Sequence, residues 1–234
     1  MNRKYINYFD YYLELEKDVF NTESYVTIEE DNYKTYSIQY AKLYLSICSE
    51  IDCLLKEICR NINSDTTANK INLYYPIVNG AFENFKQEGV YFKKQKIELY
   101  PWKKWEESSS PIWWYYYNKV KHQRLELEPD TNIPYYKFAN LENVLNALAA
   151  LYIVEQYYLY SYNYLAEVVI QSESEEGDMS PTELADNEKA FAMYEFTSKK
   201  CFMKRWKENY CYLSTYSEQY VDLDKLDYIM HNNS

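Results

Sequence analysis

Residues Thr35 to Asn63 read TYSIQYAKLYLSICSEIDCLLKEICRNIN, and they indicate the fold class before any other part of the chain. Two neighbouring rows of mainly apolar residues recur at three- and four-residue spacing, which is the period of an α-helix. The first row is Ile38, Ala41, Leu45, Cys48, Asp52, Leu55, Cys59 and Ile62, and the second is Tyr40, Tyr44, Ile47, Ile51, Leu54 and Ile58. Ser46, Glu50 and Glu57 mark the solvent side. A helix with so wide an apolar face is typical of the centre of a bundle.

A second long helix is predicted from Phe138 to about Val169, and a less regular one from Asn2 to Phe20. Between the two long helices, Val90 to Tyr100 alternates weakly, which predicts a short β-hairpin or an extended insertion. Its charged residues favour an exposed element. We therefore expect an all-α fold, an antiparallel helical bundle built on the two long helices, with this short insertion.

Polar and acidic residues divide the chain after this bundle. We assign residues 1–170 to the bundle and residues 171–188, which include SESEEGD, Gly177 and Pro181, to an acidic linker. Residues 189–234 are expected to form a C-terminal helical segment docked on the bundle, with an amphipathic helix from Lys189 to Asn209.

The composition excludes several classes of site. Three isolated glycines provide no G-x-G-x-x-G or P-loop sequence, so dinucleotide and P-loop nucleotide chemistry are not expected. Five cysteines without a C-x-x-C pair and two distant histidines offer no zinc set, and we expect neither a metal nor a cofactor. The free cysteines favour a reducing cytoplasm, and no signal sequence or bilayer-spanning run is recognised.

Charge is distributed unevenly along the chain. The formal net charge is −11, which by itself counts against a nucleic-acid partner. Residues 86–124, however, carry nine basic and four acidic side chains, a net charge of +5, so the remainder carries −16. This basic segment can form a phosphate-binding face, or it can pair with the acidic body of the same or a second copy of the chain. The tryptophans within it, Trp102 and Trp105, are expected to anchor it to the bundle.

The segment PIWWYYYNKVKHQR, Pro111 to Arg124, holds the main candidate site. It contains His122, and the other histidine, His231, is the fourth residue from the C-terminal end. Pro111 suits the first turn of a helix, which places Asn118 and His122 side by side one turn apart. The candidate catalytic residues are thus His122 and Asn118, and the candidate substrate-binding residues are Lys119, Lys121, Arg124 and Tyr117. RNA bases can stack on the neighbouring aromatic residues while phosphates meet the cations.

The run Tyr117-Asn118-Lys119-Val120-Lys121-His122 resembles the signature of the HEPN superfamily of helical domains, at its Asn and its His. That signature places an Arg, a polar residue, three further residues and a His on a short helix; Tyr117 stands here in place of the Arg. The resemblance covers about Thr35 to Val169. It implies a homodimer in which two motif helices face one cleft, and in many members a metal-independent ribonuclease of bacterial defence or toxin–antitoxin systems.

For such a member the resemblance implies attack of an RNA 2′-hydroxyl on its own phosphodiester. His122 would carry the proton, Asn118 would orient His122 or the phosphate, and Lys121 or Arg124 would replace the missing Arg. Because Tyr117 lacks the positive charge of the signature Arg, the resemblance does not decide whether the chain is catalytically active.

Three functional hypotheses remain. The first is a dimeric ribonuclease; the second is a non-catalytic relative that binds RNA, a nucleotide or a protein; the third makes the segment only a dimer interface. Packing alone can also explain the aromatic run, and a structural hydrogen bond can explain Asn118 beside His122. Asp52, within an apolar row, can orient His122 or a tyrosine hydroxyl, or that row is less buried than its pattern indicates. We favour an RNA-associated domain with catalysis undecided.

Overall fold

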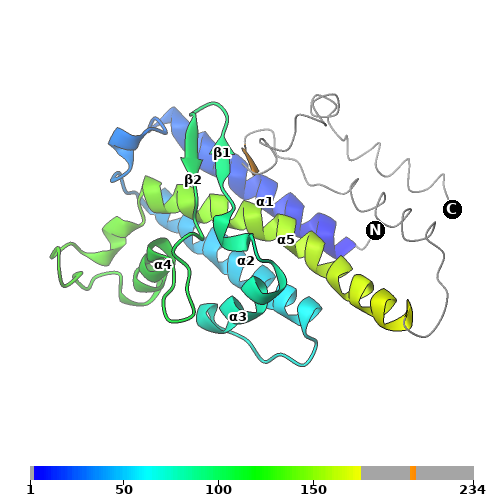
Figure 1. Cartoon of the computed structure of the whole chain (residues 1–234). Helices are drawn as coiled ribbons and strands as arrows, with labels where there is room; N and C mark the ends of the chain where they lie inside the picture. Colours follow the sequence, from blue (N-terminus) through cyan, green and yellow to red (C-terminus); the bar gives the residue numbers. More distant parts are fainter. Residues whose placement is uncertain (1–2, 175–200, 204–234) are drawn as a thin grey trace.

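The computed structural model describes residues 3–174 and 201–203 and shows a mainly helical protein (Figure 1). Three long helices lie together, α1 (Arg3–Asn21), α2 (Ile38–Ile62) and α5 (Leu141–Ser174). Two shorter helices, α3 (Ile71–Ala81) and α4 (Ile112–Gln123), pack against α2. The expected helical bundle with a small β insertion is confirmed in this outline.

Helix α2 begins at a polar cap and buries one broad face. The Ser37 hydroxyl accepts a hydrogen bond from the Tyr40 backbone N–H at 3.0 Å, which satisfies one of the free donors of the first turn. The second of the two predicted apolar rows is buried throughout. The first row is not, because Ile38 is 79% exposed at the helix start and Asp52 is only half-buried. The buried face is therefore narrower at the N-terminal end of α2 than the pattern predicts.

Helix α5 is the centre of the bundle. Every side chain from Ala147 to Tyr158 is buried, so this part of the helix is covered on all sides. Helix α1 runs antiparallel to it: the Tyr8 ring meets the Tyr158 ring at 5.4 Å between centroids, and the Tyr12 ring meets the Tyr152 ring at 5.5 Å.

Helices α2 and α5 run in the same direction, so the antiparallel packing expected for the two long helices is wrong. Near their starts, the Leu141 N–H donates to the Thr35 carbonyl at 2.9 Å. Near the end of α2, the Asn61 amide donates to the Ser161 hydroxyl at 2.9 Å. The reason is the connection: a short loop makes consecutive helices antiparallel, whereas the long segment through α3 and α4 returns the chain to the level at which α2 starts.

A small antiparallel sheet lies beside α5, in the order β2-β1-β3. The predicted hairpin is present as β1 (Val90–Phe92) and β2 (Ile97–Leu99), with Val90 opposite Leu99. Lys96 closes the turn with a φ of 58°, in the left-handed region. The hairpin was expected to be exposed, but Val90 and Phe92 are fully buried because alternate residues of β1 point into the core.

The segment after residue 170 departs from the expected boundaries where it is described. Helix α5 continues to Ser174, so the first four residues of the expected linker are helical. Within the expected helix Lys189–Asn209, residues Cys201–Met203 form β3 and pair with the open edge of β1, with Phe92 opposite Cys201. The rest of the linker and of the C-terminal segment, including His231, lies outside the described residues. None of the described helices combines the length and apolarity that a membrane span requires.

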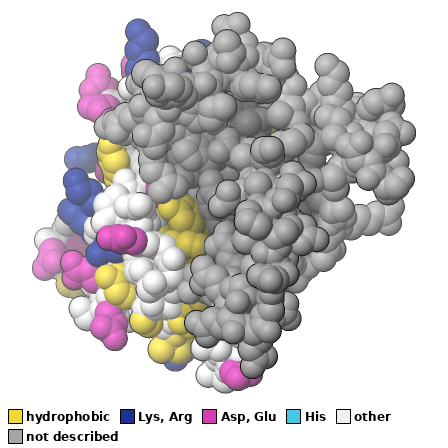
Figure 2. All heavy atoms as spheres, turned by 45° about the vertical axis from the view of Figure 1, so that its right-hand side comes forward, with side chains coloured by type: hydrophobic (Ala, Val, Ile, Leu, Met, Phe, Trp, Pro, Cys, Tyr) yellow, Lys and Arg dark blue, Asp and Glu magenta, His cyan; other side chains and the backbone are white. Residues whose placement is uncertain are grey.

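Basic and acidic side chains of the described residues are interspersed on the face shown in Figure 2. Some lysines of the basic segment bind other side chains of the same chain. The Lys94 ammonium pairs with the Glu23 carboxylate at 2.6 Å, and the Lys86 ammonium donates to the Tyr75 hydroxyl at 3.4 Å. Pairing of the basic segment with acidic groups of its own chain is thus realised at Lys94.

Candidate functional site

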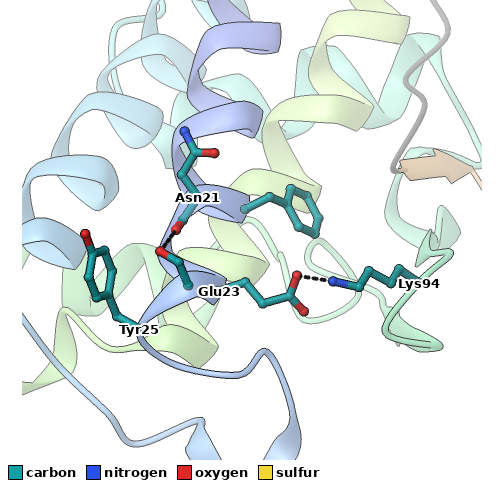
Figure 3. A pocket seen from close by; sticks show the side chains of 6 residues that line it. Asn21, Glu23, Tyr25 and Lys94 are labelled. Atoms are coloured by element: carbon teal, nitrogen blue, oxygen red, sulfur yellow. Dashed lines mark hydrogen bonds and ion pairs between the residues drawn. The ribbon is translucent and has the colours of Figure 1, made fainter.

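A hollow of about 530 Å³ lies between the end of α1 and the turn of the β1–β2 hairpin (Figure 3). Phe20, Asn21, Glu23, Ser24, Tyr25 and Lys94 line it. Its two charged side chains pair with each other, and the Ser24 hydroxyl donates to the Asn21 carbonyl at 2.7 Å. Because its two charged side chains already bind each other, we do not place the functional site in this hollow.

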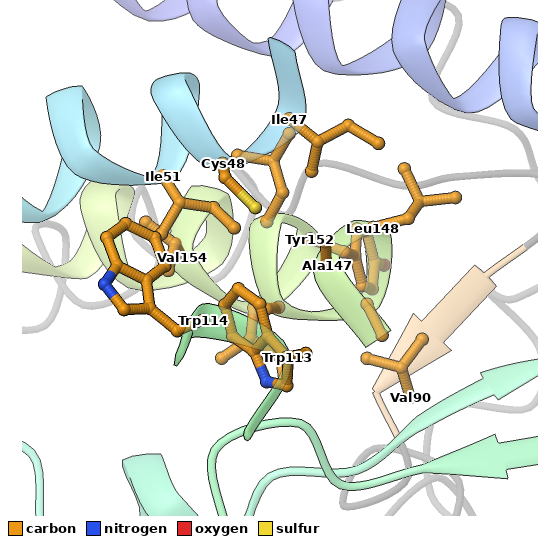
Figure 4. Packing of buried hydrophobic residues seen from close by; sticks show 14 of the residues in the cluster. Ile47, Cys48, Ile51, Val90, Trp113, Trp114, Ala147, Leu148, Tyr152 and Val154 are labelled. Atoms are coloured by element: carbon orange, nitrogen blue, oxygen red, sulfur yellow. The ribbon is translucent and has the colours of Figure 1, made fainter. Parts of the chain in front are cut away.

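Helix α4 carries the predicted site and buries one face in the bundle. The buried side chains are Trp113, Trp114, Tyr117 and Val120. Figure 4 shows the two indoles in the core near α2 and α5. The Trp113 indole N–H donates to the Pro101 carbonyl at 2.8 Å, so even its polar edge is satisfied internally. These tryptophans form core packing rather than a surface on which bases could stack.

The tryptophans upstream of α4 join the same cluster. Trp102 and Trp105 are fully buried, with ring centroids 4.8 Å apart, and Trp102 meets Trp113 edge-on at 5.2 Å. The Trp102 indole N–H donates to the Ala150 carbonyl of α5 at 3.3 Å. The expected anchoring of the loop before α4 by these two residues is confirmed.

Tyr117 lies in this buried face, although the sequence places it among the substrate-binding residues. Its ring packs edge-on against the ring of Tyr44 in α2, with centroids 6.2 Å apart, and it is 4% exposed. Only its hydroxyl reaches the edge of the helix, where it accepts a hydrogen bond from the Lys121 ammonium at 3.2 Å. Burial raises the pKa of Tyr117, which keeps its hydroxyl protonated near neutral pH.

The two candidate catalytic residues lie on the outer side of α4. The Asn118 amide N–H donates to the Trp114 carbonyl at 3.0 Å, and its Oδ1 makes no hydrogen bond within the described residues. His122, one turn later, is exposed, and no described residue binds its imidazole. Lys121 follows Asn118 by three residues, so helix geometry places Asn118, Lys121 and His122 on one surface. We call these three residues the α4 face.

The other two predicted substrate-binding cations differ in surroundings. The Lys119 ammonium lies over the rings of Tyr115 and Tyr135, 5.5 and 5.3 Å from their centroids, and donates to Gln123 at 2.6 Å. This cation is engaged with the loop after α4, on the side away from Lys121. Arg124, at the C-terminal end of α4, is exposed, and its guanidinium has no partner within the described residues.

Asp52 binds a tyrosine hydroxyl, one of the arrangements left open by the sequence. The Tyr74 hydroxyl donates to Asp52 Oδ1 at 3.1 Å, and the Lys56 ammonium lies 3.8 Å from Oδ2. Burial and the Asp52 carboxylate together raise the pKa of Tyr74. The negative charge of Asp52 also contributes to raising the pKa of Tyr117, after burial and the neighbouring Cys48.

Glu155 is a buried ionisable residue that was not predicted from the sequence. Glu155 in α5 is fully buried, and neither carboxylate oxygen has a hydrogen-bond partner in the described structure. Burial, and after it the charge of Glu50 in α2, raises its pKa well above the ordinary value. A signal was present in the sequence, because Glu155 directly follows the strongly apolar run that ends at Val154.

No family model matches this chain, and no curated protein and no solved structure is significantly similar to it. The described residues also contain no cluster of three or more His, Cys, Asp or Glu side chains that could hold a metal ion. The functional interpretation therefore depends on the α4 face itself.

Proposed function

We propose that this chain is a HEPN-like, RNA-associated helical domain whose α4 face contacts RNA. The observation that supports this best is that α4 carries an exposed His122, the Lys121 ammonium and an Asn118 amide oxygen without a described partner, on consecutive turns of its outer side. An imidazole can act as a general acid or base, and an ammonium attracts a phosphate.

These groups suit cleavage of RNA through its own 2′-hydroxyl. His122 would take the proton of the 2′-hydroxyl while the 2′-oxygen forms a bond to phosphorus. The bond from phosphorus to the 5′-oxygen then breaks, leaving a 2′,3′-cyclic phosphate. The departing 5′-oxygen takes a proton from a second imidazolium, which a homodimer would supply as the partner's His122. Lys121 would stabilise the negative charge that develops on the phosphoryl oxygens.

A second candidate is a non-catalytic domain that binds RNA or a protein partner through the same face. It is favoured by one observation: Tyr117 stands at the position of the signature Arg and is buried, so α4 has no guanidinium there. An ammonium lacks the bidentate geometry with which arginine holds a phosphate. Binding without cleavage is the outcome expected of this candidate.

The test is cleavage and binding of a mixed single-stranded RNA pool in EDTA, with the wild-type protein, His122→Ala and His231→Ala. Cleavage by the wild type and by His231→Ala, lost in His122→Ala, supports the ribonuclease. Binding by all three without cleavage supports the second candidate. Neither binding nor cleavage by a folded wild-type protein contradicts both. Light scattering of the same samples measures whether the chain is a dimer.

A further inference from the structure

The Lys121 ammonium contacts Tyr117 on the surface of α4. It donates a hydrogen bond to the Tyr117 hydroxyl at 3.2 Å and lies 5.4 Å from the centroid of the same ring. Hydroxyl and ring thus act on one cation, the first by a hydrogen bond and the second by a cation–π interaction. An ammonium has three N–H donors, so two remain for a ligand.

The ring that holds Lys121 is itself fixed. Tyr117 packs against Trp114, with ring centroids 5.1 Å apart, and edge-on against Tyr44. The Tyr44 hydroxyl in turn donates to the Trp113 carbonyl, which ties the first turn of α4 to α2. A buried ring supported in this way cannot follow the movements of an exposed lysine, so the lysine is restrained by the ring.

A restrained cation binds a phosphate at a lower entropic cost than a mobile one. A free lysine side chain loses rotamer freedom when it is immobilised, and this loss of entropy opposes binding. Part of that cost is already met in the free protein when the ammonium rests on Tyr117. Lys119 shows the alternative, because its ammonium is held between Tyr115 and Tyr135 on the other side of the helix, away from Asn118.

We propose that Tyr117 is a positioning residue, which holds the Lys121 ammonium as the phosphate-binding cation of the α4 face. The phosphate belongs to the backbone of single-stranded RNA, so this inference rests on the proposed function. Tyr117 itself does not contact the RNA.

A double-mutant cycle tests this proposal with a fluorescein-labelled, mixed-sequence single-stranded RNA as the probe. The variants are Tyr117→Phe, which removes only the hydroxyl, Lys121→Gln, and the two combined. We expect Lys121→Gln to weaken binding about five- to tenfold and to reduce the slope of log affinity against log salt by about 0.7, the value for one lost phosphate contact. Tyr117→Phe should weaken binding about two- to fivefold, as the loss of one hydrogen bond predicts.

The cycle separates positioning from a structural role. In the Lys121→Gln background, Tyr117→Phe should have almost no further effect on affinity, since the cation that it positions is gone. An equal loss in both backgrounds would assign Tyr117 to structure alone and overturn the proposal. Tyr115→Phe is the matched control, because it also removes a tyrosine hydroxyl contact of α4, the one to Tyr135 at 3.3 Å, and should leave RNA affinity unchanged.

Three further outcomes are distinguishable. If the wild type binds RNA and Lys121→Gln binds equally well, the proposed function stands and this inference fails. If the folded wild type does not bind RNA, both fail. If Tyr117→Phe lowers the melting temperature, the cycle is measured at a temperature at which circular dichroism shows all four proteins folded, and the same two comparisons apply.

Discussion

The Tyr44 hydroxyl of α2 donates a hydrogen bond to the Trp113 carbonyl of α4, and both residues are buried. This bond joins segments far apart in the chain, and the Tyr44 ring also packs edge-on against Tyr117 of α4. Burial raises the pKa of Tyr44 well above its ordinary value, so the hydroxyl remains a donor throughout the physiological range. The orientation of α4 on α2 therefore depends on a polar contact as well as on apolar packing.

Tyr44→Phe should destabilise the protein by about 1–2 kcal/mol, because it removes the donor and leaves the buried carbonyl with one partner fewer. Urea unfolding followed by circular dichroism measures this loss. Tyr25→Phe is the control, since Tyr25 is 91% exposed and should change stability little. Equal stability of Tyr44→Phe and the wild type would show that this contact does not hold α4.

Gly80 and Gly89 should respond in opposite directions to replacement by alanine. A Cβ at Gly80, in the last turn of α3, would meet no atom within 4 Å, so Gly80→Ala should stabilise the protein by about 0.5–1 kcal/mol through helix propensity. A Cβ at Gly89 would lie 2.7 Å from the Tyr100 ring, and Gly89→Ala should destabilise it because that ring must move. Thermal unfolding of both variants and of the wild type shows whether each substitution raises or lowers the melting temperature. If Gly89→Ala instead raises the melting temperature, the Tyr100 ring can move aside without a loss of stability.

The helices that the sequence predicts best are those with a sustained 3.6-residue pattern. The predicted limits of α2 lie within a few residues of the observed ones. Helix α3 was not predicted; it accommodates Pro76, a residue type that is unfavourable in the interior of a helix. The relative direction of α2 and α5 was also missed. A periodic pattern identifies the buried face of a helix but contains no information on which way its neighbour runs.

The candidate site was predicted in part. Helical spacing placed Asn118 and His122 together on α4, and the structure has them on its outer side. The spacing could not separate Tyr117, whose ring is buried, from Lys121 beside it. Nor could it show that Lys119 turns towards Tyr135, because that contact depends on how the loop after α4 folds back. Long-range packing decided both cases.

Arg124 and Lys119 should contribute unequally to RNA binding. The Arg124 guanidinium is unpartnered within the described residues, whereas the Lys119 ammonium is engaged by two tyrosine rings and Gln123. Arg124→Gln should therefore reduce the salt slope of RNA affinity by about 0.7, and Lys119→Gln by much less. Fluorescence anisotropy titrations at several salt concentrations measure both slopes. Equal reductions would indicate that the Lys119 ammonium leaves its tyrosines when RNA binds.

Glu155 makes the stability of this protein dependent on pH. Its carboxyl group is buried in the middle of α5 without a hydrogen-bond partner in the described structure, and Glu50 adds a like charge from α2. The pKa of Glu155 is therefore higher in the folded than in the unfolded protein, where it lies near the ordinary value of about 4.3. The folded state keeps a proton that the unfolded state releases. The free energy of unfolding thus falls as pH rises from the unfolded towards the folded pKa, by up to about 1.4 kcal/mol per pH unit.

Glu155→Gln removes this titration while keeping the size of the side chain. Below about pH 4 the wild type and the variant should be similarly stable, because the wild-type carboxyl group is then protonated in both states. Above that pH the variant should become progressively more stable than the wild type, until the pH passes the folded pKa of Glu155. Urea unfolding at half-unit steps between pH 4 and pH 8.5 measures the difference in the free energy of unfolding between the variant and the wild type. Plotted against pH, this difference gives the difference curve. Glu142→Gln is the control, because it makes the same change at an exposed glutamate of the same helix and should alter the free energy of unfolding little. A flat difference curve for Glu155→Gln would mean that the Glu155 carboxylate ionises in the folded protein as easily as in the unfolded chain, and that water or a cation reaches it between α2 and α5.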